Sequence, residues 1–360
     1  MIEKELLKRN LPNLLLMPNG KRVSSVKEWE SVQKPYLKEI LLREEYGKTF
    51  APIEPKITSK LNAVDFSGKA VWEEIEFLFE LGNKSHAVKT NLILPKQKSC
   101  CPVIIYINFR PDIPDRYLPV EEIIDNGFGV FSVCRGDIAS DNASFDKLAS
   151  VLISERDDET GGLLMVWAYM AMKMMDYLQL RSEVDKSKIG IAGHSRLGKT
   201  ALLAAALDER FAFVFANNSG CSGAALSRGH CLGAEKLEHI TVTFPFWFCK
   251  NYLKYIYCDD ELPFDQHYLL ALIAPRIVYV GGALEDTWAD NDNQFLSCVS
   301  ASPVWKLYNK DGLVYPNRLP LVGDEFMDGE VGFYLRAGTH YHSRTDWNIC
   351  LNALKKKLKV

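Results

Sequence analysis

The chain has 360 residues, of which 47% are apolar and 25% are charged, and its formal net charge is −3. A chain of this length and composition can bury a sizeable core, so we expect one α/β domain spanning residues 1–360. The charge is nearly balanced, and no run of like charge is longer than Lys355-Lys-Lys357. This argues against nucleic acid or a membrane surface as a partner.

Cysteine usage and the first residues bear on the cellular compartment. The nine cysteines are odd in number and lack the CxxC spacing of zinc sites. Cys100 and Cys101 are adjacent and are therefore poorly placed to form a disulfide bond with each other. The segment 1–8 mixes acids and bases, unlike the basic start and apolar core of a signal peptide. These features predict reduced cysteines and a cytoplasmic protein.

The N-terminal part differs in pattern from the rest of the chain. Residues 26–46 show helical spacing with many charges, and we expect residues 1–69 to be a helical extension packed on the main domain. Residues 71–79 and 87–94 alternate between apolar and polar side chains and are joined through Gly82-Asn83. This pattern predicts two antiparallel strands at the edge of a sheet.

Continuous apolar runs then indicate a buried parallel sheet. Residues 102–107 and 129–133 have this character, and a helical pattern at 120–125 lies between them. The run 162–180 approaches the length of a membrane span but contains charged residues. It is predicted to be a buried helix.

Two further apolar runs, 213–216 and 276–280, are predicted to be strands of the same sheet. In open α/β sheets, ligands bind beyond the carboxyl ends of the strands. The long connections 137–159 and 220–262 are expected to form walls of a substrate cleft there.

Residues 188–207 predict a strand, a tight turn at glycines and a helix, and two chemistries fit the turn. Gly193, followed after four residues by Gly198-Lys199-Thr200, matches a phosphate-binding loop. Alternatively, Ser195 occupies a nucleophile elbow, in which a strained turn exposes the serine hydroxyl above the sheet. The elbow match is loose, because Leu197 stands where a small residue is usual.

Residues further along the chain favour the elbow. An elbow serine needs an acid and then a histidine, in that order. The pair Glu285-Asp286 follows the apolar strand, and His340 follows a later apolar segment. The residue pattern leaves the choice between these two acids open, and His342 is the fallback for His340. A phosphate loop would instead need a strand ending in an acid for its metal, so a hydrolase is the favoured interpretation.

Several motifs taken together resemble the bacterial branch of the glucuronoyl esterases. These are Gly193-His-Ser195-Arg196-Leu-Gly198-Lys199, Asn217-Asn218-Ser-Gly-Cys-Ser-Gly-Ala-Ala-Leu-Ser-Arg228, Phe244-Pro-Phe-Trp-Phe248, Leu269-Leu-Ala-Leu-Ile-Ala-Pro-Arg276, Glu285-Asp286-Thr-Trp288-Ala-Asp290, and Arg336-Ala-Gly-Thr-His340 with Asp346-Trp347. The resemblance covers roughly residues 102–347. It implies an α/β-hydrolase fold, with a mostly parallel sheet between helices on both faces. It also implies a serine esterase that cleaves (4-O-methyl)glucuronate esters, in small molecules or oligosaccharides, without metal or cofactor.

The resemblance also implies residue roles. Ser195 corresponds to the family's nucleophile, His340 to its general base and Arg196 to the arginine that stabilises the oxyanion. The residues implied to contact the sugar are Lys199, Glu235 and Trp288.

The acid is where this chain departs from the family pattern. Many members carry a glutamate just after the strand that follows the elbow helix, where this chain has Asn217-Asn218. Some bacterial members use an acid after the next strand, two residues before the tryptophan, which matches Asp286. The resemblance therefore makes Asp286 the preferred acid, with Glu285 second and Asp290 third. The departure leaves open a binding protein with the same fold and no activity.

The substrate also stays open at this point. A cytoplasmic location fits poorly with polymeric cell-wall substrates, so a short uronate ester or an acetylated sugar, such as the substrate of an acetyl xylan esterase, is an alternative. The sequence does not indicate the oligomeric state.

Overall fold

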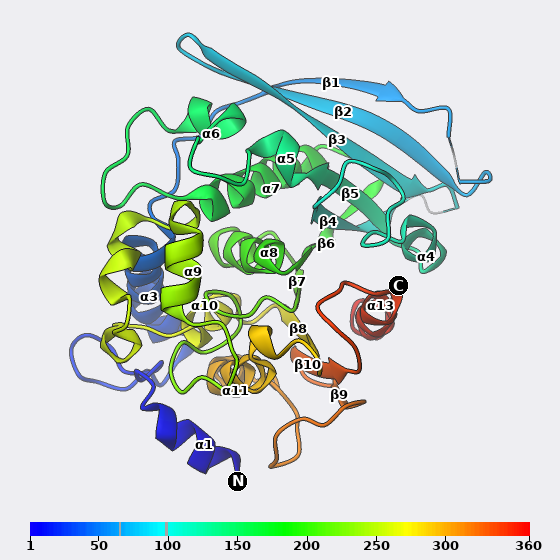
Figure 1. Ribbon diagram of the computed structural model, residues 1–360. Helices are drawn as coiled ribbons and strands as arrows, with labels where there is room; N and C mark the ends of the chain where they lie inside the picture. Colours follow the sequence, from blue (N-terminus) through cyan, green and yellow to red (C-terminus); the bar gives the residue numbers. More distant parts are fainter. Residues whose placement is uncertain (65, 98–99) are drawn as a thin grey trace.

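The computed structural model describes residues 1–64, 66–97 and 100–360, which form a ten-stranded sheet with helices on both faces (Figure 1). The strand order across the sheet is β1-β2-β3-β5-β4-β6-β7-β8-β10-β9. The strands are β1 (Lys56–Leu61), β2 (Ala70–Leu81), β3 (Lys84–Pro95), β4 (Cys101–Asn108), β5 (Gly129–Cys134), β6 (Val184–His194), β7 (Phe213–Asn217), β8 (Ile277–Ala283), β9 (Glu325–Phe326) and β10 (Val331–Arg336).

The middle of the sheet is parallel. Strands β5, β4, β6, β7, β8 and β10 pair in that order, all in parallel. Every residue of β4, β7 and β8 is buried, as expected for strands covered on both faces. The prediction of a mostly parallel α/β-hydrolase sheet is confirmed.

One edge of the sheet is an antiparallel extension. β2 and β3 form a long hairpin, as their alternating pattern predicts, and β3 joins the parallel part through β5. The expected helical extension over residues 1–69 is wrong at Lys56–Leu61, which form edge strand β1 on β2. All six residues of β1 are exposed. Because neither face is buried, the segment carries no alternation of apolar and polar residues that would reveal a strand.

Helices cover both faces of the sheet, and a separate core lies on each. On one face, α7 and α8 pack against the central strands, and α4 and α13 lie on the other face (Figure 1). Buried side chains of α4 and α13 form one core there together with Tyr106 of β4 and Phe215 of β7. The α-helices are α1 (Ile2–Arg9), α2 (Val26–Glu28), α3 (Lys34–Leu41), α4 (Val120–Asp125), α5 (Arg135–Ile138), α6 (Lys147–Leu152), α7 (Leu163–Gln179), α8 (Arg196–Leu207), α9 (Leu237–Thr243), α10 (His267–Ala271), α11 (Asn291–Ala301), α12 (Pro303–Leu307) and α13 (Arg344–Leu358).

Shorter helical turns complete the chain. Two π-helical turns, η1 (Trp29–Gln33) and η2 (Leu42–Tyr46), flank α3, and the 3₁₀ turns are η3 (Pro245–Trp247), η4 (Lys250–Tyr255), η5 (Asp259–Glu261) and η6 (Thr287–Ala289). The N-terminal helix α3 packs against α10. In the described ranges of the chain, no helix has both the length and the apolar character to cross a bilayer; the predicted buried helix is α7.

Strand register brings four connections to one edge of the sheet. His194 at the end of β6 lies opposite Asn217 at the end of β7, and Arg336 at the end of β10 lies opposite Ala283 at the end of β8. The segments that come after these ends carry Ser195, Asn218, Asp286 and His340. Residues that are far apart in sequence therefore meet beyond the carboxyl ends of neighbouring strands.

Candidate active site

Ser195 lies in a strained turn between β6 and α8. Its backbone angles, φ 57° and ψ −130°, are rare for a residue with a side chain, and its N–H donates to the carbonyl of Asn217 at 2.9 Å. Gly193 makes this turn possible, because a Cβ there would lie 2.0 Å from the carbonyl oxygen of Leu197. The Leu197 side chain points into the core and is 1% exposed. A large residue two places after the serine is therefore compatible with an elbow.

His340 and Asp286 form a hydrogen-bonded pair beside this turn. His340 Nδ1 lies 2.6 Å from Asp286 Oδ2, and the same carboxylate oxygen accepts from the amide of Asn218. Burial by itself would raise the pKa of Asp286, but the hydrogen bond and charge of His340 and the Asn218 amide hold that pKa below its ordinary value. Asp286 is thus suited to stay a carboxylate and to orient the imidazole.

The other acids and the other histidine of the predicted set lie elsewhere. Glu285 has an exposed side chain. Asp290 caps the N-terminus of α11 through the N–H of Asn293 and also accepts from the N–H of Cys231. His342 is completely buried, stacks on Trp347 with ring centroids 4.7 Å apart, and has a pKa lowered to about 3 by burial.

Arg196 comes directly after Ser195 and is held by aromatic rings and an acid. Its guanidinium lies 4.7 Å from the ring centroid of Trp247, and it forms an ion pair with Asp141. Asp141 also accepts from the indole N–H of Trp247 at 2.7 Å. The Nε donor of Arg196 is buried and has no partner among the residues that the structure describes. Asp141 therefore does not satisfy every donor of this guanidinium.

Lys199, one turn into α8, is almost completely buried. Its ammonium donates to the carbonyls of Ser219 and Cys221, and it lies 3.8 Å from a carboxylate oxygen of Glu235. Burial lowers the pKa of Lys199, although the charge of Glu235 acts in the opposite direction. Trp288 stands nearby, with 49% of its surface exposed, and its ring lies 5.1 Å from that of His239.

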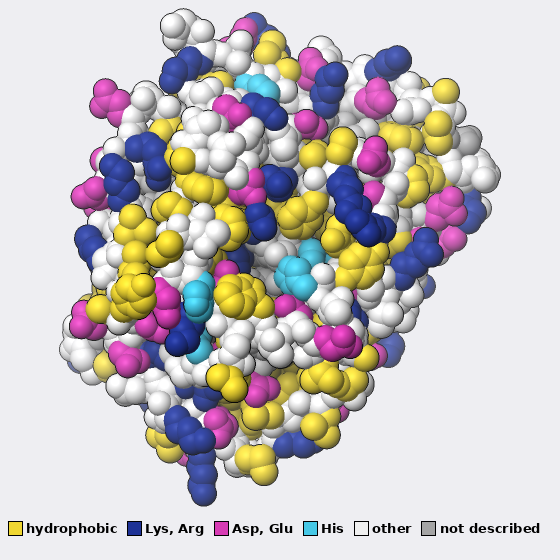
Figure 2. Space-filling model, viewed as in Figure 1, with side chains coloured by type: hydrophobic (Ala, Val, Ile, Leu, Met, Phe, Trp, Pro, Cys, Tyr) yellow, Lys and Arg dark blue, Asp and Glu magenta, His cyan; other side chains and the backbone are white. Residues whose placement is uncertain are grey.

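Ser195, the His340–Asp286 pair and the residues expected to contact the substrate line one cavity of about 320 Å³. Its lining residues are Ser195, Arg196, Lys199, Asn218, Ser219, Gly220, Glu235, Phe244, Trp247, Asp286, Trp288, Ala289 and His340. A larger cavity, about 800 Å³, lies beside α1, and none of the predicted site residues lines it. In Figure 2, this face is hollowed near its middle, with histidine, Lys or Arg, and hydrophobic side chains around the hollow. The predicted nucleophile, base, preferred acid, oxyanion arginine and sugar contacts therefore line one pocket, and part of its wall comes from the connection 220–262, as predicted.

Comparisons with known proteins place the chain in a family. A family model described as glucuronyl esterase of fungi matches residues 79–309. The chain belongs to this glucuronyl esterase family.

Among solved structures, the glucuronoyl esterase from Solibacter usitatus is 30% identical and has a TM-score of 0.87, with 96% of this chain and 97% of that chain covered. A carbohydrate esterase from an unknown prokaryotic organism is 29% identical over 96% of this chain and 89% of its own length. A 4-O-methyl-glucuronoyl methylesterase from Podospora anserina is 25% identical over 75% of this chain, which spans about half (54%) of that protein.

Family membership makes this chain a carboxylic ester hydrolase and confirms the resemblance seen in its motifs. The phosphate-loop interpretation of residues 193–200 is accordingly set aside. The structure is consistent with this, since the ammonium of Lys199 is directed to backbone carbonyls inside the protein.

Two residues of the site were not singled out from the sequence. Asn218 was treated only as a departure from the family pattern, whereas its amide contacts the acid. Asp141 lies 55 residues before Arg196 in an irregular connection. Its sole sequence signal is its place in 137–159, one of the predicted cleft walls.

Proposed function

We propose that this esterase hydrolyses esters of (4-O-methyl)glucuronate through an acyl-enzyme on Ser195. The observation that carries the proposal is the shared cavity, in which Ser195 and the His340–Asp286 pair lie beside the sugar-binding candidates Lys199, Glu235 and Trp288.

In the proposed mechanism, His340 accepts the hydroxyl proton as Ser195 attacks the ester carbonyl, and Asp286 stabilises the imidazolium. The negative charge that develops on the carbonyl oxygen is met by Arg196 and by the first N–H groups of α8, which have no partner within the helix. The intermediate collapses, and the alcohol leaves with the proton from His340. Water, activated by the same histidine, then releases the glucuronate and restores Ser195.

The uronate assignment is supported by the arrangement of charge around the cavity. The 3.8 Å between Lys199 Nζ and Glu235 Oε2 exceeds a hydrogen bond. A sugar hydroxyl near this pair can accept from the ammonium and donate to the carboxylate. Trp288 offers a partly exposed ring for the face of a sugar. The methylesterase from Podospora anserina acts, by its name, on a 4-O-methyl-glucuronoyl ester.

We also propose that the protein works in a reducing compartment such as the cytoplasm. Cys221, Cys249, Cys298 and Cys350 are buried free thiols, which suits this setting. A cytoplasmic enzyme would act on short, imported uronate esters rather than on polymers. Cell fractionation tests this point, and recovery in the secreted fraction would contradict it.

The decisive experiment compares two substrates. The purified protein is incubated with benzyl glucuronate and, separately, with an acetylated xylo-oligosaccharide, beside Ser195→Ala. The control is Ser187→Ala, which changes an exposed serine at the opposite end of β6. We expect glucuronate release by the wild-type protein and the control, and a loss of at least about 10³-fold in Ser195→Ala.

Other outcomes are informative. Release of acetate alone would keep the serine mechanism and refute the uronate assignment. No turnover of either ester, with tight binding of glucuronate, would indicate a binding protein with this fold. Lys199→Met separates recognition from chemistry: we expect it to raise KM for benzyl glucuronate and to leave turnover of 4-nitrophenyl acetate nearly unchanged.

A further inference from the structure

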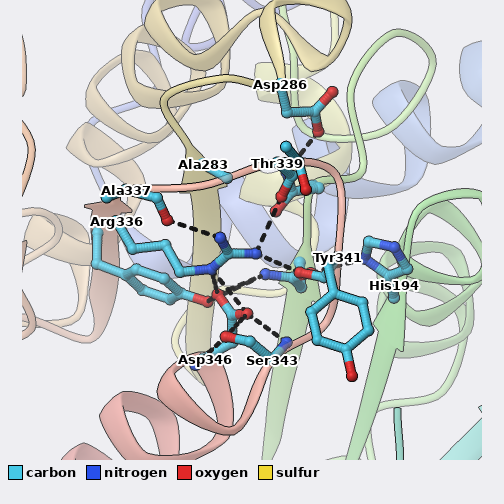
Figure 3. Close-up of polar contacts among 12 residues, drawn as sticks. His194, Ala283, Asp286, Arg336, Ala337, Thr339, Tyr341, Ser343 and Asp346 are labelled. Atoms are coloured by element: carbon cyan, nitrogen blue, oxygen red, sulfur yellow. Dashed lines mark hydrogen bonds and ion pairs between the residues drawn. The ribbon is translucent and has the colours of Figure 1, made fainter. Parts of the chain in front are cut away.

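His340 lies on the irregular segment between β10 and α13, and the side chain of Arg336 fastens that segment. The Arg336 guanidinium donates to the carbonyl of Ala337 at 2.8 Å, to that of Thr339 at 3.2 Å, and to that of Tyr341 (Figure 3). These acceptors lie on both sides of His340 in the sequence. A guanidinium holds its five N–H donors in a fixed planar fork on three nitrogens, whereas a lysine ammonium has three donors on a single nitrogen.

The same segment is joined to the one that carries Asp286. The N–H of Leu284 donates to the carbonyl of Arg336 at 2.9 Å, and the N–H of Glu285 donates to that of Gly338 at 3.0 Å. The backbone that supports His340 and the backbone that supports Asp286 are therefore held against each other. A shift of the histidine segment would also disturb the His340–Asp286 hydrogen bond.

Asp346, in the first turn of α13, anchors the guanidinium. Arg336 Nε donates to both of its carboxylate oxygens at 2.8 and 2.9 Å, and Ser343 donates through its N–H and its hydroxyl. The hydroxyl of Tyr334 and the amide of Asn217 donate to the same carboxylate. Asp346 is 0% exposed, so these donors replace all of its water.

A second path leads from Asp346 back to the imidazole of His340. Asn217 donates to Asp346 and accepts from Nδ1 of His194 at 2.7 Å, and the His194 ring lies 4.5 Å from that of His340. Burial, with His342 and His340 nearby, keeps the pKa of His194 well below its ordinary value. The neutral ring does not repel the imidazolium that forms on His340. Asp346 is thus connected to His340 in two ways. One runs through Arg336 to the backbone on either side of His340, and the other runs through Asn217 and His194 to the imidazole ring of His340.

We propose that Arg336 and Asp346 are positioning residues that hold His340 at the angle required for proton transfer. The inference rests on the proposed function, because it takes His340 to be the general base. The mechanism proposed above assigns no role to Arg336 or Asp346.

The main test is Arg336→Lys, which keeps a positive charge opposite Asp346 but supplies one nitrogen in place of three. The matched control is Arg344→Lys, at an exposed arginine that pairs with Glu122. Misplacing a reacting group by about 1 Å costs on the order of 10²-fold in rate. With benzyl glucuronate, we therefore expect kcat to fall about 10- to 100-fold in Arg336→Lys, with KM changed less than about threefold. The control should match the wild-type protein.

A second readout does not depend on turnover. The proton that His340 Nδ1 shares with Asp286 should give a far-downfield proton NMR signal, which Asp286→Asn removes. We expect Arg336→Lys to weaken or broaden that signal in folded protein. If the wild-type protein hydrolyses no glucuronate ester, the proposed function fails while this signal still tests the positioning role.

The proposal is overturned if folded Arg336→Lys keeps a wild-type kcat and an unchanged signal, with only a lower melting temperature. Ser343→Ala is the second variant, because it removes one hydroxyl donor from Asp346 and keeps both charges. A fall in kcat of about two- to fivefold at constant KM is expected, in proportion to a single hydrogen bond. An unchanged kcat in Ser343→Ala, if Arg336→Lys does not fold, would also overturn the proposal.

Discussion

Glu45 provides a quantitative test of how the protein interior near Lys199 affects a buried carboxyl group. It lies in η2, is 0% exposed, and its carboxyl faces Gln266, whose amide nitrogen lies 3.1 and 3.0 Å from the two oxygens. The next residue, Tyr46, donates to the carbonyl of Ser222, beside the loop that receives the ammonium of Lys199. We predict that Glu45→Gln makes the protein less sensitive to alkaline pH.

The magnitude can be worked out from the pKa of Glu45. Burial raises the pKa of Glu45 to about 8 from the ordinary 4.5, while the hydrogen bond from Gln266 acts in the opposite direction. Between these two pKa values the folded state keeps a proton that the unfolded state releases. The stability that this proton contributes to the folded state is fully present below pH 4.5 and is lost as the pH rises through about 8. At about 1.4 kcal/mol per pH unit, wild type should lose about 4 kcal/mol relative to the variant between pH 5 and pH 9.

The assay is urea unfolding followed by circular dichroism at pH 5, 7 and 9. Wild type is compared with Glu45→Gln and with Glu39→Gln, whose side chain is 70% exposed on the neighbouring helix α3. As the pH rises, the unfolding free energy of the wild-type protein should fall relative to that of Glu45→Gln. Glu39→Gln should show the same pH dependence as the wild-type protein. Parallel pH profiles for all three proteins would show that Glu45 is ionised in the folded state and refute the reasoning.

Three further predictions concern the site and the core. Asp286→Asn should lower kcat by about 10³- to 10⁴-fold in steady-state kinetics with benzyl glucuronate. The double variant Asp286→Asn/Asn218→Glu should recover part of that loss. Trp288→Ala should raise KM about 3- to 10-fold with kcat and melting temperature nearly constant, because the half-exposed ring supports little of the core. Gly190→Ala should destabilise the fold by at least about 2 kcal/mol in urea unfolding, since a Cβ would lie 2.2 Å from the ring of Phe213.

The parts that could be predicted from the sequence are those with a local physical signature. The runs at 102–107 and 129–133 lie inside β4 and β5, because strands buried on both faces must be apolar throughout. The elbow could be recognised because Gly193 permits a turn that a Cβ would block. The meeting of Ser195, Asp286 and His340 could then be predicted, because the carboxyl ends of parallel strands gather at one edge of the sheet.

The parts that could not be predicted depend on contacts between distant segments. Lys56–Leu61 carries no burial pattern and becomes a strand only because β2 offers an unpaired edge. The contact of Asp141 with Arg196 joins an irregular connection to a helix start, and no periodicity encodes it. Arg336 and Asp346 occur in motifs of the sequence, but their contact could not be predicted. Their hydrogen bonds depend on how the chain turns between β10 and α13.

The position of the acid shows why geometry, rather than a place in the sequence, defines such a site. Because β7 and β8 are neighbours in the sheet, residues just beyond their ends reach the same point: the Asn218 amide and His340 Nδ1 both contact Oδ2 of Asp286. The imidazolium needs one negative charge at this point, and either strand end can supply it. With the charge on Asp286, the residue after β7 is best a neutral donor, since a second carboxylate there would repel the first and one of them would keep a proton. Asparagine at 218 is therefore the expected partner of an aspartate at 286, and its presence argues for an intact acid rather than for a lost one.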